Sequence, residues 1–232
     1  TLSCFFSIGL IPTGSRDPFA LRRSGNSLVN VLWHEGNTLS LNQLINSLDE
    51  KFKKDVKLVN EIKNFLIDRL YNFLIEEGFG SDKLNAIISQ DNIGQKTFLE
   101  IKSELKALDK ILNIKSGIKF ISNFKRVYNI TKKSETLPNS IKIKRELFVF
   151  KEETQLYDFL TKLSKSNKIS SVFNSNRKQL DHIKEFNSLI EKFFDNVLVN
   201  DEDIKIKNNR INLLTNIKIN FEMICKFQLI KT

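Results

Sequence analysis

The sequence has few of the residues that interrupt helices or build metal and redox sites. Only eight of its 232 residues are glycine and three are proline, so long segments run without strong helix breakers. The two cysteines, Cys4 and Cys225, stand near opposite ends of the chain. This arrangement argues against a disulfide framework or a cysteine-rich metal site and favours two reduced thiols. No alternation of apolar and polar residues is long enough to indicate a strand.

Long apolar runs are also missing. No run approaches the roughly 18 residues that a membrane span requires, so we expect no membrane partner. The first eleven residues are partly apolar but carry no cationic stretch, which makes a signal peptide unexpected. Together with the reduced thiols, this predicts a cytoplasmic protein. The chain begins at Thr1 without an initiator methionine, and we expect a fragment whose N-terminal part is missing.

The recurrent motifs of catalytic and nucleotide-binding sites are absent as well. The chain contains no G-x-S-x-G, P-loop, G-x-G-x-x-G or C-x-x-C motif. His34 and His182 are the only histidines, and each is expected to be an ordinary surface or boundary residue rather than a metal ligand. The acidic run 201–203 is expected to be a solvated turn that caps the last helix rather than a cation site. We therefore predict no catalytic residue, no metal and no cofactor in this chain.

What the chain does contain is apolar residues at helical spacing, with a hydrophobic fraction of 41% that fits a globular protein. The periodicity predicts an all-α fold. Asp17 is expected to cap a first helix that starts at Pro18, since proline loses no needed hydrogen bond there. Ser116 and Gly117 are expected to interrupt or end a helix. The predicted helices cover approximately residues 18–33, 41–48, 55–77, 82–88, 98–112, 118–128, 145–163, 178–194 and 208–227.

The net charge of +10 is concentrated in one stretch. Residues 101–151 hold thirteen Lys and Arg against four Asp and Glu, a net charge of +9, which leaves +1 for the rest of the chain. Such a concentration predicts a surface that binds a polyanion. The alternative is that the nucleotide bias of an AT-rich genome raises the lysine content of the whole chain. Aromatic residues interleave with these cations and could stack on unpaired bases. For Phe124 and Tyr128 we favour a place in the core, and Phe120 is left open between the two roles.

Three separated segments resemble one family. Residues 14–23, with Pro12 before them, resemble the motif P-x-G-x-x-D-P-F-A-L-R-R of the beta subunit of bacterial two-subunit glycyl-tRNA synthetase. Residues 123–130 are similar to N-x-K-R-V-x-N-I in that family's DALR-type anticodon-binding domain. Residues 193–199 and 209–214 are similar to F-F-D-x-V-x-V and N-R-L-x-L-L. The segments follow the family's order, but residues 24–27 depart from its usual A-A-L-G, and Gly25 and Asn26 would weaken a helix there.

The resemblance implies a domain organisation for an all-α chain that matches the C-terminal third of a beta subunit. Residues 1–36 would end an HD-like helical domain, and residues 37–94 would form a helical linker region. Residues 95–232 would form the DALR-like anticodon-binding helical bundle, after a candidate boundary at residues 90–94. The string at residues 14–23 is then a turn and helix start at a domain junction, away from the RNA surface.

The resemblance also implies a function. The chain would be the tRNA-binding, anticodon-recognising region that supports ATP-dependent attachment of glycine to its tRNA. ATP, Mg and glycine would be used by a separate alpha subunit. Glycine tRNA and that alpha subunit, in an alpha2/beta2 assembly, are the implied partners. The alternative is a helical scaffold that docks the alpha subunit or another protein and whose basic charge is incidental.

The tRNA-contact candidates follow from the motif and from the charge. Lys125 and Arg126 are supported by the motif, and Lys119, Lys132 and Lys133 are weaker candidates for phosphate contacts. Arg210 is left open between a tRNA contact and a structural bridge to a neighbouring carboxylate.

Overall fold

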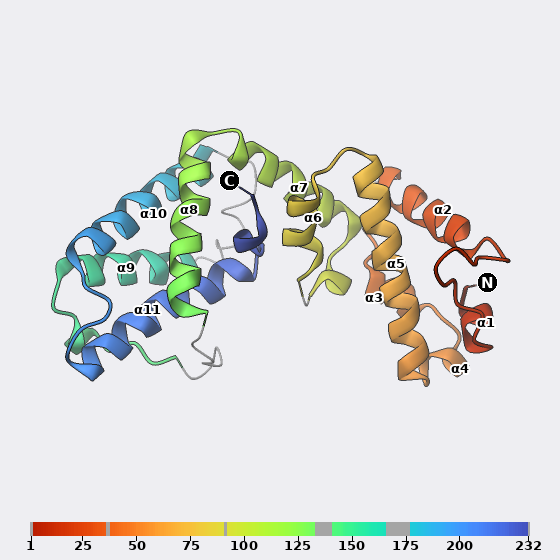
Figure 1. The fold of residues 1–232 in the computed structure, drawn as a ribbon, viewed down its shortest axis with the longest axis horizontal. Helices are drawn as coiled ribbons and strands as arrows, with labels where there is room; N and C mark the ends of the chain where they lie inside the picture. The colour runs from red at the N-terminus through yellow and green to blue at the C-terminus, as the bar shows by residue number, and fades with distance from the viewer. Residues whose placement is uncertain (1, 36–37, 91, 133–140, 166–176, 232) are drawn as a thin grey trace. The chain divides into compact units, whose positions relative to one another are not determined.

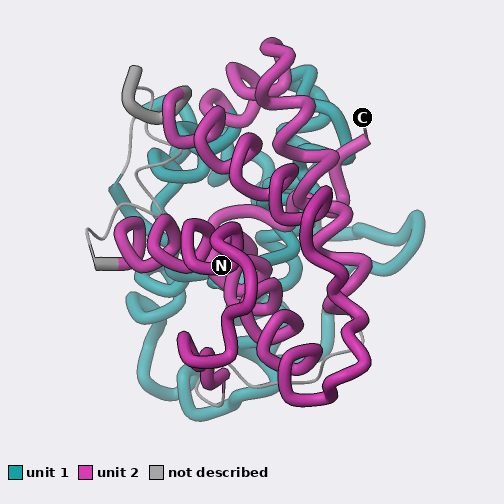
Figure 2. The backbone as a smooth tube through the Cα atoms, turned by 90° about the vertical axis from the view of Figure 1, so that its left-hand side faces the viewer, with its two compact units in different colours: residues 1–105 teal, residues 106–232 magenta. Residues whose placement is uncertain are grey.

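The computed structural model describes residues 2–35, 38–90, 92–132, 141–165 and 177–231. Within these ranges the only regular elements are helices, and no strand occurs, which confirms the predicted all-α class (Figure 1). The chain divides into two compact units, residues 1–105 and 106–232 (Figure 2). The junction expected at residues 94 and 95 falls inside the first unit, and the division into three domains stays a prediction.

The first unit is organised around its longest helix, α5 (Val56–Glu76). Leu66, Leu70 and Leu74 of α5 are almost completely buried, and their spacing of four residues places them on one helix face. The other helices of this unit are α1 (Leu2–Ser7), α2 (Leu21–His34), α3 (Leu41–Asn46), α4 (Glu50–Lys53), α6 (Ser81–Ile88), the 3₁₀ helix η1 (Ile93–Gln95) and the start of α7 (Phe98–Leu112). Helices α1, α2, α3, α4 and α6 all pack against α5.

The start of α2 differs from the prediction. The helix begins at Leu21 rather than at Pro18, because Ala20 adopts a left-handed backbone conformation with φ 53°. Asp17 still acts as the capping residue, since its carboxylate accepts hydrogen bonds from the backbone N–H groups of Leu21 (2.8 Å) and Arg22 (3.1 Å). Pro18 therefore lies in the preceding turn, and the capping carboxylate reaches the helix from outside its first turn.

Gly25 has a packing reason to be glycine. It is buried in α2, and a Cβ atom there would lie only 2.8 Å from the ring of Phe65 in α5. The two helices therefore meet at a position where a methyl group has no room. The glycine weakens α2 locally, but it permits the close approach of α5.

In its described residues, the second unit is a bundle of the long helices α8 (Lys115–Thr131), α9 (Lys151–Lys165), α10 (Arg177–Asn196) and α11 (Ile204–Glu222). Helix α8 packs against α10 and α11, and α9 packs against the same two helices. The 3₁₀ helices η3 (Arg145–Leu147) and η5 (Phe227–Leu229) complete the unit, and η5 also packs on α8.

The break between α7 and α8 lies earlier than expected. The chain turns at residues 113–114, and Ser116 and Gly117 belong to the first turn of α8. A Cβ atom at Gly117 would overlap the backbone carbonyl of Ile111. The glycine is thus required by a close approach of the end of α7, rather than by the end of a helix.

Phenylalanine rings fill the centre of the bundle. The ring centroid of Phe120 lies 5.3 Å from those of Phe186, Phe221 and Phe227. Phe120 is 1% exposed and Phe124 is fully buried, which settles the open role of Phe120 and confirms the core position of Phe124. Tyr128 is only half-buried, with the ammonium of Lys218 lying 5.5 Å from its ring centroid.

Across the described ranges, none of the helices combines the length and the apolarity needed to cross a membrane.

Candidate functional site

Helix α8 carries a cationic face without acidic side chains. The stretch from Ile111 to Lys132 contains no Asp or Glu, and the buried apolar residues of α8 face the bundle. Lys115, Lys119 and Arg126 are exposed, and their spacing of four and seven residues places them on one side of the helix. Lys125 is half-buried, and the exposed Lys132 follows the last turn. Lys133 lies outside the residues that the structure describes.

Lys119 already has a carboxylate partner. Its ammonium lies 2.9 Å from the carboxylate of Glu191 in α10. Asn123 also donates a hydrogen bond to Glu191, at 3.1 Å. The hydrogen bond from Lys119 is the largest of the effects that hold the pKa of Glu191 below its usual value. Glu191 therefore stays ionised and offsets much of the positive charge that Lys119 presents to solvent.

Arg126 lies against an aromatic ring. Its guanidinium carbon is 3.9 Å from the ring centroid of Phe194 in α10, a distance typical of a cation–π contact. The pair borders a pocket of about 390 Å³, which we call the Arg126 pocket. Its lining includes Arg126 and Ile130 from α8, Phe194 from α10, residues 197–200 of the loop that follows, and Ile211 from α11.

The Arg126 pocket joins segments that the sequence analysis treated separately. Residues 123–130 and 193–199 each carry part of the family resemblance, and the fold brings them to one pocket. The pocket remains partly apolar and open, since Leu198 is 70% exposed and Ile130 is 37% exposed. Nothing in the spacing of these residues along the chain indicates the pocket, because the contact depends on how α8 and α10 pack.

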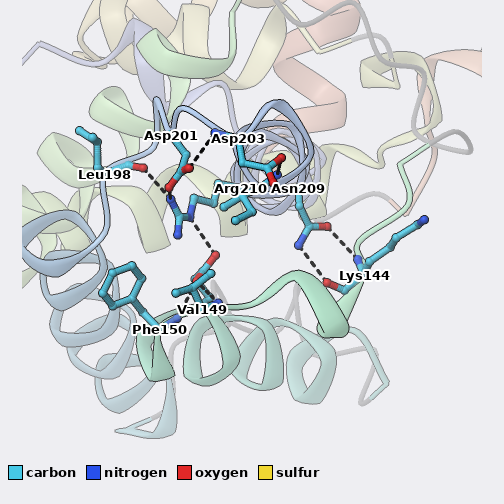
Figure 3. Close-up of polar contacts among 10 residues, drawn as sticks. Lys144, Val149, Phe150, Leu198, Asp201, Asp203, Asn209 and Arg210 are labelled. Atoms are coloured by element: carbon cyan, nitrogen blue, oxygen red, sulfur yellow. Dashed lines mark hydrogen bonds and ion pairs between the residues drawn. The ribbon is translucent and has the colours of Figure 1, made fainter.

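Arg210 in α11 is an almost completely buried charged side chain that contacts Leu198 in the wall of this pocket (Figure 3). Its Nε donates to the carboxylate of Glu153 at 3.0 Å, and its Nη1 donates to the carboxylate of Asp201 at 2.6 Å. The same Nη1 donates to the backbone carbonyl of Leu198 at 2.9 Å. The side chain is 1% exposed, so the question left open by the sequence is resolved in favour of the structural bridge.

Glu153 in α9 accepts hydrogen bonds from two different segments of the unit. One carboxylate oxygen accepts from Arg210, and the other accepts the backbone N–H groups of Val149 and Phe150, each at 2.8 Å. The ring of Phe150 lies below the guanidinium, 5.5 Å from its carbon. The start of α9 is thereby tied to α11 and to the loop after α10.

The acidic run 201–203 is divided between two roles. Asp203 caps α11 by accepting from the backbone N–H of Lys205 at 2.7 Å, which confirms the predicted cap. Asp201 is not simply solvated, because it accepts from Arg210. A hydrogen bond from the backbone of Asp203 and then the bond from Arg210 hold the pKa of Asp201 below its usual value. Within the described residues, no group of three or more His, Cys, Asp or Glu side chains is placed to hold a metal ion.

Comparison with known proteins assigns the second unit to a class. Residues 121–227, which run from α8 to η5, match the family model of the DALR anticodon binding domain. The class is therefore that of anticodon-binding helical bundles. Residues 1–89 match a second family model, described as glycyl-tRNA synthetase beta subunit. The chain belongs to the family of glycyl-tRNA synthetase beta subunits, as its three motifs predicted.

Curated relatives match this chain over all or nearly all of its length. The chain is 34% identical over 222 residues to the glycine–tRNA ligase beta subunit of Halothermothrix orenii, which covers 93% of this chain and 31% of the relative. It is 29% identical over 258 residues to that of Trichodesmium erythraeum, covering 100% of this chain and 35% of the relative. The chain therefore spans about a third of the length of the curated relatives that it matches.

Proposed function

We propose that this chain is the tRNA-binding, anticodon-recognising region of a glycine–tRNA ligase beta subunit. The observation that carries the proposal is the cationic face of α8, a helix without acidic side chains, whose part from Ile121 onward lies inside the segment that matches an anticodon binding domain. Lysine and arginine on such a face neutralise phosphates and release counterions, which gives binding without dependence on base sequence.

Burial and charge pairing support the proposed contacts to different degrees. Arg126 is exposed and keeps a planar, permanently charged group on the outer side of α8. Lys125 lies beside it and Lys132 follows at the end of the helix. Lys119 contributes less, because Glu191 offsets its charge. Lys133 stays a candidate on sequence grounds alone.

The proposal includes a division of labour in a cytoplasmic enzyme. An alpha subunit, in an alpha2/beta2 assembly, uses ATP with Mg to activate glycine, and this chain positions glycine tRNA for the transfer. The chain then supplies no catalytic residue and no cofactor of its own. Support for these partners comes from the names of the relatives, which are beta subunits of glycine–tRNA ligases.

A binding titration tests the proposal. Labelled glycine tRNA is titrated with the chain and with the double variant Lys125→Glu, Arg126→Glu over a series of salt concentrations. We expect the affinity to fall at least tenfold and the slope of log K against log salt to decrease by about 2, one for each lost phosphate contact. The matched control is Lys54→Glu, Lys57→Glu, which reverses two exposed charges in the first unit and should bind like the parent.

Equal binding by parent and double variant, or binding that does not depend on salt, would contradict the proposal. Co-purification with the alpha subunit without measurable affinity for tRNA would instead favour the helical scaffold.

A further inference from the structure

We propose that the Arg126 pocket holds one unstacked base of the bound RNA, stacked on the guanidinium of Arg126. This inference rests on the proposed function, because it names what one part of the same surface recognises. The cationic face of α8 accounts for phosphate contacts, which carry no information about sequence. A pocket beside that face offers a place where a base could be read.

The guanidinium of Arg126 already lies against one aromatic ring. The guanidinium lies 3.9 Å over the ring of Phe194, while Arg126 as a whole remains exposed. A guanidinium is planar and weakly hydrated, so a second planar group can lie on its outer side. Unpaired RNA bases are commonly stacked on arginine planes and on aromatic rings.

The rest of the pocket suits a base better than a charged or bulky group. Leu198 and Ile130 leave apolar surface in water, which a base face would cover. Among the described residues that line the pocket none is acidic, and the exposed amide of Asn200 offers both a donor and an acceptor to a base edge. The volume of about 390 Å³ is at the small end of ligand pockets, and it is sufficient for a single base.

The wall of the pocket is held in place by Arg210. The backbone carbonyl of Leu198 accepts from Arg210, and Arg210 is itself fixed by Glu153 and Asp201. The loop that carries Leu198 and Asn200 is therefore anchored to the interior of the bundle before RNA binds. A preorganised wall reduces the entropy that binding must overcome. Arg210 is thus a positioning residue for the pocket, and it does not itself reach the RNA.

A charge-conserving variant separates stacking from phosphate contact. Arg126→Lys keeps the positive charge but removes the planar group, and Phe194→Leu keeps an apolar side chain but removes the ring. We expect each variant to bind glycine tRNA about tenfold more weakly, the loss of one stacked base, with the salt slope of the parent retained. The matched control Arg16→Lys makes the same exchange at an exposed position of the first unit and should bind like the parent.

A fluorescent base locates the contact. Glycine tRNA transcripts carry 2-aminopurine at one anticodon-loop position each, and fluorescence is followed as the parent chain is added. We expect the emission to change most at one position, and Leu198→Ser to reduce that change while the exposed control Leu99→Ser leaves it intact.

The outcomes distinguish the two proposals. If the parent binds tRNA with the expected salt dependence but Arg126→Lys and Phe194→Leu bind equally well, the base pocket is wrong and the proposed function stands. If the parent does not bind tRNA at all, the proposed function fails and the pocket proposal falls with it.

Discussion

Arg210 and Glu153 form an ion pair in the interior of the second unit, with 3.0 Å between Nε and Oε1 and side chains that are 1% and 0% exposed. The pair joins α11 to the start of α9, and the second carboxylate oxygen of Glu153 accepts the backbone N–H groups there. Burial of two charges is tolerated because almost every polar atom of the pair has a partner.

The first prediction concerns this pair. Replacing Arg210 by Ala leaves Glu153 buried without its counter-charge, so the free energy of unfolding should fall by about 3 kcal/mol or more. Urea unfolding followed by circular dichroism measures the change. The control is Arg145→Ala, which breaks the solvent-exposed pair with Asp158 and should cost less than about 1 kcal/mol. Similar losses in the two variants would contradict a larger stabilising effect of the buried pair than of the exposed one.

A second prediction concerns Gly117. Gly117→Ala places a methyl group against the backbone carbonyl of Ile111, and backbone cannot move aside as easily as a side chain. Although alanine favours helix, the variant should lose about 1–3 kcal/mol of stability through overpacking. Ser122→Ala, at an exposed position of the same helix, serves as the control and should be neutral or slightly stabilising. A stabilised Gly117→Ala protein would mean that α7 and α8 approach less closely.

The cap of α11 gives a third prediction. Asp203→Ala removes the acceptor for the backbone N–H groups of Lys205 and Ile206, and the expected loss is about 1 kcal/mol. Asp203→Asn, which keeps an oxygen acceptor, should recover most of it. The neighbouring Glu202 is exposed, so Glu202→Ala should change the urea midpoint little. If Glu202→Ala is as damaging as Asp203→Ala, the effect is one of local charge rather than capping.

A fourth prediction concerns Asp201 and the loss of folding stability at acid pH. Because the folded-state pKa of Asp201 lies below its usual value of 3.8, its contribution to stability is present above about pH 4 and is lost as the pH falls through the folded-state pKa. The parent should therefore lose more stability than Asp201→Asn between pH 6 and pH 3. Thermal unfolding at the two pH values measures the difference, and parallel losses would contradict the lowering of this pKa by the hydrogen bonds from the Asp203 backbone and from Arg210.

The last prediction concerns the charge next to Lys119. Glu191→Gln removes the carboxylate 2.9 Å from the ammonium and leaves Lys119 to act on bound phosphates. We expect the affinity for glycine tRNA to rise about two- to threefold at low salt and the gain to shrink as salt screens the charge. Glu202→Gln removes an exposed negative charge elsewhere in the unit and should have a smaller effect. A loss of affinity in Glu191→Gln would indicate that Glu191 orients Lys119 instead of competing for it.

Local chemistry made parts of this structure predictable from the chain. Asp17, Ser40 and Asp203 each accept backbone N–H groups at the start of a helix, because a short polar side chain just before an apolar repeat can satisfy those donors. The residue at which α2 begins was not predictable in this way. Its first residue depends on the left-handed conformation of Ala20, which nothing in the local sequence requires.

The sequence by itself determined the helical class, the family and the concentration of positive charge, because periodicity, motif order and charge can be read along the chain without knowing which residues meet in space. Only the tertiary structure decided which cations face an aromatic ring, a carboxylate or solvent. Arg126 meets Phe194, Lys119 meets Glu191 and Arg210 is buried on Glu153. Each of these contacts joins residues more than fifty positions apart, and packing of apolar faces, rather than any local preference, sets which side chains meet.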